Sequence, residues 1–284
     1  MSIDLLEPFT VPFVRRAVIG GVLLSAVSAL VGVWVIVRGM TFLGEAMSHG
    51  MLPGVAIAAL LGGSLVLGAA VSAFAMALGV NALRRNKRFG QDTSIGLLFV
   101  GMLSIGVILV SHSQSFATDL TAFLFGDVLA IRPEDLGLLL GALAFVALVS
   151  VPLYRPFLVL SFDPRKAQTL GLRPDLANVA MLTLLTITIA VSFHVVGTLL
   201  SFGMLIAPSA GALLVARRIP TVMAVAFAIG SFSTVVGVLV SWNAGTAAGA
   251  SIAATAVATF FALAGVVQFV ERRSAKRPVT EFSS

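Results

Sequence analysis

Glu45 and His49 are the two side chains of this sequence whose types and spacing best suit cation binding. They stand four residues apart, so on a helix both lie on one face, with Cβ atoms about 5–6 Å apart. A carboxylate oxygen and an imidazole nitrogen from one helical turn can ligate a single ion, a combination that suits Zn²⁺ or Mn²⁺. A hydrogen bond within one helix at a membrane boundary explains the same spacing, so the residues alone leave both interpretations open.

Two further ionisable residues are candidates for a cation pathway. His194 lies inside the apolar run 179–200, where an ionisable group is costly and usually marks a pathway or a partner. A hydrogen bond to a neighbouring helix is the more ordinary explanation of a lone histidine there. Asp127, in LFGDVL, could attract cations to an outer mouth or cap a loop.

The sequence contains none of the usual catalytic motifs. It has no G-x-x-x-x-G-K-[ST] phosphate loop, no HExxH motif, no paired carboxylates and no Ser–His–Asp order. The absence of cysteine excludes disulfides and thiolate metal sites. We therefore do not expect an enzyme, and any ATP-driven process would need a separate ATPase.

Composition predicts that these residues are positioned by membrane-spanning helices. Of the 284 residues, 58% are hydrophobic and 11% charged, whereas soluble domains carry about 25% charged residues. Mean hydropathy is +1.07. A transmembrane helix needs about 20 mainly apolar residues. Such runs occur at 17–37, 43–62, 64–83, 93–112, 136–155, 178–197, 199–216, 221–241 and 249–270. We predict an all-α polytopic integral membrane protein with about eight or nine transmembrane helices in one domain, 1–284, without a removable signal peptide.

Charge patterning orients the predicted helices. The net charge of +6 is gathered in short basic clusters between apolar runs, as the positive-inside rule requires, and no aromatic residues interleave them as nucleic-acid binding would need. The basic tail 271–284 and the loop 156–177 are therefore expected in the cytoplasm, and the acidic loop 113–135 outside. Three apolar runs precede Arg84, so nine spans put the N-terminus outside, unless one run does not cross.

Two segments between or within the apolar runs are unusual. Residues 38–54, RGMTFLGEAMSHGMLPG, are polar and rich in glycine, which predicts an interrupted helix of the kind that marks transport sites. Residues 162–174, FDPRKAQTLGLRP, predict a short cytoplasmic helix with Asp163 as N-cap, Pro164 in the first turn and Gly171 at the end. Its face with Ala167 and Leu170 suits docking into a partner's groove. A helix lying on the lipid headgroups is the alternative.

Five motifs in order resemble those of the membrane subunits of bacterial ABC importers for zinc, manganese and iron. They are LGEAMSHGMLPGVAIA (43–58), DTSIG (92–96), LFGD (124–127), FDPRKAQTLG (162–171) and VGTLLSFGMLIAPSAGA (196–212). The resemblance covers nearly the whole chain. It implies an ABC importer permease fold in the bacterial plasma membrane, with the C-terminus in the cytoplasm.

The resemblance also implies roles for particular residues. Glu45 and His49 match the metal-coordinating acid and histidine of the family, which often has Asp where this chain has Glu45. The segment that couples to the ATPase matches Phe162, Asp163, Pro164, Ala167, Leu170 and Gly171.

The implied partners are two cytoplasmic ATPase subunits, an external metal-binding protein, and a second permease subunit, either an identical copy or a sister subunit. No cofactor is permanently bound; the cargo is Mn²⁺ or Zn²⁺, with Fe²⁺ as a third candidate. The alternatives are a permease for a metal chelate or siderophore and a secondary transporter that needs no ATPase.

Overall fold

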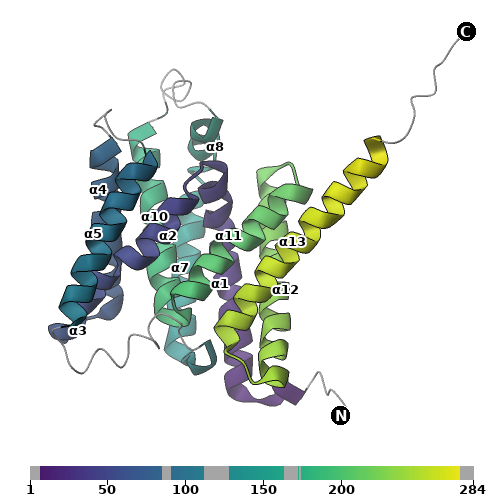
Figure 1. Ribbon diagram of the computed structural model, residues 1–284, viewed down its shortest axis with the longest axis horizontal. Coiled ribbons are helices and arrows are strands. Elements are labelled where there is room, and N and C mark those ends of the chain that lie inside the picture. Colours follow the sequence, from purple (N-terminus) through teal and green to yellow (C-terminus); the bar gives the residue numbers. More distant parts are fainter. Residues whose placement is uncertain (1–6, 85–90, 112–127, 163–171, 173, 276–284) are drawn as a thin grey trace, which may run out of the picture.

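The computed structural model describes residues 7–84, 91–111, 128–162, 172 and 174–275, and over these residues the chain is helical without a strand (Figure 1). Two 3-10 turns, η1 (Glu7–Thr10) and η2 (Val128–Ala130), accompany the α-helices. The α-helices are α1 (Pro12–Val37), α2 (Thr41–Gly50), α3 (Leu52–Leu60), α4 (Leu65–Arg84), α5 (Gln91–Ser111), α7 (Pro133–Ser150), α8 (Tyr154–Phe162), α10 (Pro174–Val196), α11 (Thr198–Val215), α12 (Ile219–Ala244) and α13 (Ala248–Ala275).

Within the described residues, seven helices are long and apolar enough to cross a membrane: α1, α4, α5, α7, α10, α12 and α13. The shorter α11 and the consecutive pair α2–α3 occupy two more of the predicted runs. The predicted all-α membrane architecture with eight or nine spans is thereby confirmed, with the run 43–62 divided into two short helices. The start of α1 and the end of α13 lie at opposite ends of the bundle, as an odd number of crossings requires (Figure 1).

Basic residues gather at the end of the bundle where α13 finishes. The ends of α1, α4 and α11 and the whole of α8 lie at this end in Figure 1. The basic residues on or beside these elements and at the end of α13 are Arg38, Arg84, Arg155, Arg217, Arg218, Arg272 and Arg273. By the positive-inside rule this end faces the cytoplasm.

The region predicted as a cytoplasmic loop, 156–177, is helical at both of its edges. Helix α8 ends at Phe162 and α10 begins at Pro174. Helix α8 belongs to the folded bundle because Phe157 is fully buried against Trp34 of α1. The apolar face of α8 therefore binds the first part of the expected loop to the membrane domain.

Close helix contacts hold the bundle together, since lipid gives apolar helices little reason to associate. A Cβ atom added at Gly32 of α1 would lie 2.1 Å from the Leu205 carbonyl oxygen of α11. A Cβ added at Gly54 of α3 would lie 2.1 Å from the Gly68 carbonyl oxygen of α4. At both places two helix backbones touch because neither a methyl group nor a larger side chain separates them.

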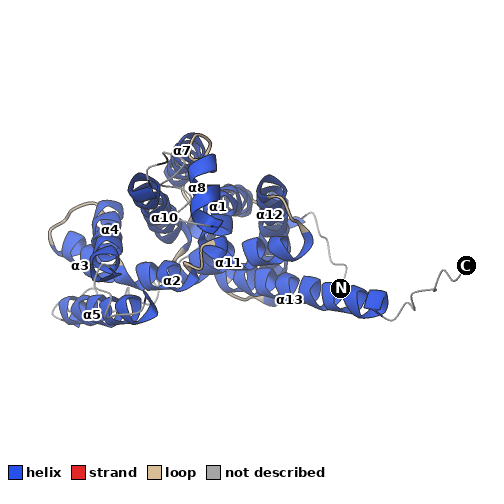
Figure 2. Cartoon of the chain, turned by 90° about the horizontal axis from the view of Figure 1, so that it is seen from above, coloured by secondary structure: helices blue, strands red, loops and turns tan. Residues whose placement is uncertain are grey.

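Seen from above, α5, α2, α11 and α13 line one side of the molecule and α7 lies on the other (Figure 2). Helix α2 contacts α4, α5, α10 and α11, and so lies near the middle of that side. Helix α13 leans away from the bundle (Figure 1) and exposes Phe261 and Phe269 along its length. Near its end, the Arg273 guanidinium lies 4.4 Å from the centre of the Phe269 ring.

Candidate metal centre

Helix α2 is a ten-residue segment whose open face carries the predicted metal ligands. It follows a tight corner at Gly39, whose φ of +64° lies in the left-handed region that glycine adopts without strain. Six residues of α2 are buried among its neighbours. Phe42, Glu45 and His49, spaced i, i+3 and i+7, remain partly exposed on one face of the helix.

Glu45 and His49 meet on this face as their spacing predicts. Glu45 Oε1 lies 3.1 Å from His49 Nε2, and the two side chains are 34% and 28% exposed. The His49 ring packs edge-on against Phe99 of α5, with ring centroids 5.7 Å apart, which helps to fix its orientation. Two ligand atoms 2.0–2.2 Å from one tetrahedral ion lie roughly 3.4 Å apart. An ion could therefore replace the shared proton with little movement of either side chain.

The two side chains are an incomplete metal site. Among the described residues, no group of three or more His, Cys, Asp or Glu side chains converges in a way that could hold a metal. Met47 and Met51 are fully buried on other faces of the helix. In the described part of one chain, this candidate centre therefore consists of one carboxylate and one imidazole.

The break that follows His49 is supported by α4. Pro53, at the second position of α3, has no N–H to donate, so the helical ladder is interrupted at this point. The Ser72 hydroxyl of α4 donates a buried hydrogen bond of 2.7 Å to the Gly50 carbonyl oxygen. Irregular backbone at membrane depth requires such partners. The predicted interruption in residues 38–54 is thus present, and α4 fixes its geometry.

We expect Ser72→Ala to destabilise the protein by about 1–2 kcal/mol, because the buried Gly50 carbonyl loses its Ser72 donor. Thermal unfolding of the detergent-solubilised protein measures the change. Ser104→Ala is the matched control, since the Ser104 hydroxyl donates to the carbonyl of Val100 within the same exposed helix. Equal unfolding temperatures for the two variants would show that the Ser72 bond does not support the break.

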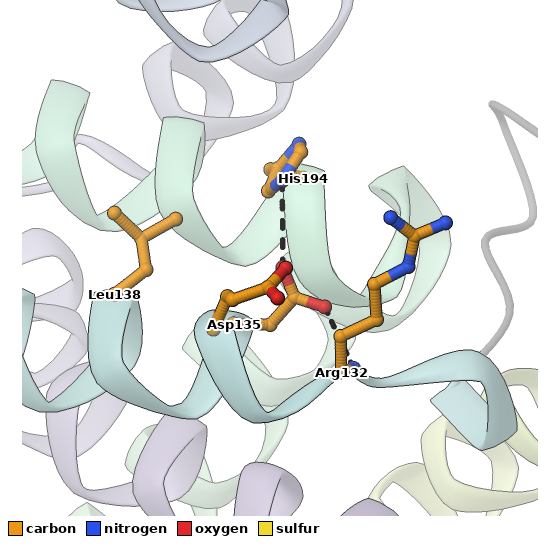
Figure 3. A pocket seen from close by; sticks show the side chains of 5 residues that line it. Arg132, Asp135, Leu138 and His194 are labelled. Atoms are coloured by element: carbon orange, nitrogen blue, oxygen red, sulfur yellow. Dashed lines mark hydrogen bonds and ion pairs between the residues drawn. The ribbon is translucent and has the colours of Figure 1, made fainter.

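His194, the other predicted pathway residue within the described chain, lies next to Asp135 of α7 (Figure 3). His194 Nε2 is 3.6 Å from Asp135 Oδ1, and Asp135 Oδ2 accepts a 2.8 Å hydrogen bond from the Arg132 backbone N–H. The pair borders an outer cavity of about 530 Å³, lined also by Glu134 and Leu138. Figure 2 places α10 between α7 and α2, so this cavity lies apart from Glu45 and His49.

Sequence reasoning missed Asp135 as the partner of His194. It assigned Asp135 to an outer loop, whereas the residue lies in the first turn of α7, where its carboxylate completes a capping box with Arg132. The Pro-Glu-Asp run at 133–135 is an ordinary start of a helix and is the signal that could have placed it there. The pairing with His194 could not have been read from it, because the two residues come from different helices.

We expect His194→Gln to lower the free energy of unfolding by less than about 1 kcal/mol, because partly exposed ion pairs contribute little. Chemical denaturation in detergent measures this change, and transport assays measure the KM for metal uptake, which we expect to stay constant. A raised KM at unchanged stability would instead place His194 on the cation pathway.

Most of the predicted coupling segment lies outside the described residues. Phe162 is the final residue of α8 and is half-buried. The other five predicted residues, Asp163, Pro164, Ala167, Leu170 and Gly171, fall outside the described residues, as does Asp127. Their roles remain predictions from the sequence.

Comparison with known proteins gives the chain a family. Residues 10–267 match the ABC 3 transport family. The "Manganese import system permease protein ScaB" of Streptococcus parasanguinis is 34% identical over 272 residues, covering 96% of both chains. The "Manganese transport system membrane protein MntC" of Halalkalibacterium halodurans is 34% identical over 89% of this chain and 86% of its own. A "Probable iron transport system membrane protein" of Haemophilus influenzae is 34% identical over 87% of this chain and 91% of its own.

Two solved structures share the architecture. "PsaBC from Streptococcus pneumoniae in complex with Fab" superposes with a TM-score of 0.83 at 30% identity, covering 93% of this chain and 95% of that one. An inward-facing "putative metal-chelate type ABC transporter" gives a TM-score of 0.69 at 15% identity over 90% of this chain and 85% of that one, which shows a shared fold alone. With the family match over most of its length, this multi-pass membrane chain belongs to the ABC 3 transport family.

Proposed function

We propose that this chain is the membrane permease of an ABC importer for a divalent transition metal ion, with Mn²⁺ as the first candidate. The observation that carries the proposal is the Glu45–His49 pair on the open face of an interrupted helix. Carboxylate and imidazole suit Mn²⁺, Zn²⁺ and Fe²⁺ alike. Two relatives covering most of the chain are named for manganese and another for iron, which favours Mn²⁺ as the first metal to test.

A second permease subunit would complete the metal site. Transition metals in proteins take four to six ligands, and the described pair supplies two. The open face of α2 lies near the middle of the side formed by α5, α2, α11 and α13 (Figure 2). A two-fold axis through that side would bring Glu45 and His49 of two copies together, giving two carboxylates and two imidazoles. A sister subunit with the same motif would serve equally.

ATP hydrolysis would be supplied by two cytoplasmic ATPase subunits, because the sequence has no phosphate-binding loop. They would dock on the segment 162–171, which follows α8 at the cytoplasmic end of the bundle. An external metal-binding protein would deliver the ion at the opposite end. Alternating access of the permease pair would then expose Glu45 and His49 first to the outside and next to the cytoplasm.

The test is reconstitution of the permease in liposomes with its ATPase and its external binding protein, loaded with ⁵⁴Mn²⁺. We expect uptake that needs all three components and ATP, and that excess Zn²⁺ or Fe²⁺ inhibits to differing extents. Uptake without the ATPase would identify a secondary transporter instead. Uptake of an iron chelate in preference to the free ion would identify a chelate permease.

A further inference from the structure

The two helices that flank residues 163–173 both hold the cytoplasmic end of α1. From α8, Tyr154 and Phe157 pack edge-on against the Trp34 ring, with centroids 5.6 and 5.7 Å away. From the start of α10, the Asn178 side-chain oxygen accepts a hydrogen bond from Arg38 Nη2. Trp34 and Phe157 are fully buried, so this aromatic contact belongs to the core of the bundle.

The same end of α1 leads directly into the helix that carries the candidate metal ligands. Only Arg38, Gly39 and Met40 separate α1 from α2. The backbone N–H groups of all three donate to carbonyls in the last turns of α1: Arg38 to Trp34, Gly39 to Ile36 and Met40 to Val35, at 2.8–3.0 Å. The Met40 carbonyl then accepts from Gly44 of α2 at 3.1 Å. This hydrogen-bonded corner leaves little slack between α1 and α2.

We infer that Arg38 and Asn178, together with Trp34, relay movement of the cytoplasmic coupling segment to Glu45 and His49. They are positioning residues, because none of them lies in the Glu45–His49 pair. A displacement of the segment 163–173 would move α8, α10 or both, and each holds α1 at a residue within four positions of the Gly39 corner. The inference rests on the proposed function, in which that segment receives the ATPase.

The chemistry of the Arg38 contact suits a relay. A hydrogen bond from a guanidinium is stronger than one between neutral partners, and its planar donor group fixes direction as well as distance. Because the acceptor is a neutral amide, the bond does not change with pH. It joins residues 140 positions apart, so it ties together two helices that no local chain connection holds.

The experiment uses the permease–ATPase complex with its binding protein in liposomes and measures Mn²⁺ transported per ATP hydrolysed. We expect Arg38→Gln and Asn178→Ala each to lower this ratio by about 3- to 30-fold, the range of known coupling effects, while ATP hydrolysis continues. The double variant should be no worse than either single one, because one shared bond is lost. Asn178→Asp should retain coupling, since a carboxylate also accepts from Arg38.

Arg16→Gln is the matched control, because Arg16 makes a similar bond at the other end of α1, from Nε to the Ile131 carbonyl at 3.0 Å. We expect it to leave the ratio unchanged. The inference is overturned if Arg38→Gln and Asn178→Ala behave like this control. It is also overturned if their lower ratio is matched by weaker equilibrium Mn²⁺ binding without ATP or by a lower unfolding temperature, since either would indicate a local or structural role.

Ala167→Glu separates failure of this inference from failure of the proposed function. A bulky charge at the predicted docking face should itself uncouple hydrolysis from uptake. If Ala167→Glu uncouples and the Arg38 and Asn178 variants do not, the relay is wrong and the docking assignment stands. If Ala167→Glu leaves uptake and docking normal, the docking assignment is wrong and with it the basis of the relay.

Discussion

His49→Ala abolishes metal uptake while the protein still inserts and folds in the membrane. The expected loss exceeds about 100-fold, since even the removal of a residue that merely orients a ligand weakens metal sites 10- to 100-fold. Folding survives because the imidazole is partly exposed and only its edge contact with Phe99 is lost. Uptake of ⁵⁴Mn²⁺ measures transport, and the amount of protein in the membrane fraction, with its unfolding temperature, measures folding.

Phe42→Ala is the matched control for this variant. Phe42 lies on the same open face of α2 and is 44% exposed, but offers no ligand atom. We expect it to keep most of the uptake. Normal uptake by His49→Ala would refute the site assignment.

Two related measurements examine the chemistry of the pair. Glu45→Asp should keep uptake but alter the preference between Mn²⁺ and Zn²⁺, because the charge is retained on a shorter side chain. Uptake by the wild type should fall in acid, since His49 must be neutral to bind a metal.

Gly68→Val should have the largest effect on stability among the changes considered. A Cβ at Gly68 would lie 2.4 Å from the Gly54 carbonyl oxygen and 2.7 Å from Ala58 Cβ, and backbone cannot move aside as a flexible side chain can. Overpacking usually destabilises by about 1–3 kcal/mol, and a branched side chain between two helix backbones belongs at the upper end of that range. Displacement of α3 from α4 should also disturb the break after His49, so uptake falls together with stability.

Thermal unfolding in detergent and ⁵⁴Mn²⁺ uptake both test this prediction. Gly141→Val is the matched control: Gly141 is a helical glycine of α7 with no atom within 4 Å of its added Cβ. We expect this control to stay close to the wild type in both assays. Equal unfolding temperatures for the two valine variants would contradict the close packing of α3 on α4.

Hydropathy was sufficient to predict the membrane class and the positions of the apolar runs, because a bilayer demands about 20 apolar residues per helix whatever the tertiary fold. Glycine and proline between residues 38 and 54 predicted the interruption. The i, i+4 spacing predicted the contact between Glu45 and His49, since that contact is local to one helix.

Contacts between distant helices could not be predicted in the same way. Nothing in the sequence near His194 points to Asp135, and nothing near Arg38 points to Asn178, because each pair is brought together by packing across the bundle. The helical character of α8 was missed for a similar reason. Its nine residues are too few to span a membrane, and they are fixed by burial of Phe157 against Trp34 rather than by length.

The length and lean of α13 make this part of the permease sensitive to bilayer thickness. Its apolar stretch, 248–270, is roughly 35 Å long at 1.5 Å per residue, whereas the hydrocarbon layer is about 30 Å thick. A tilt of roughly 30° removes this hydrophobic mismatch. The Arg273–Phe269 contact then anchors the end of the helix at the headgroups. Thicker membranes should therefore bring α13 upright, changing its angle against α11 and α12, so that acyl-chain length becomes a variable of transport.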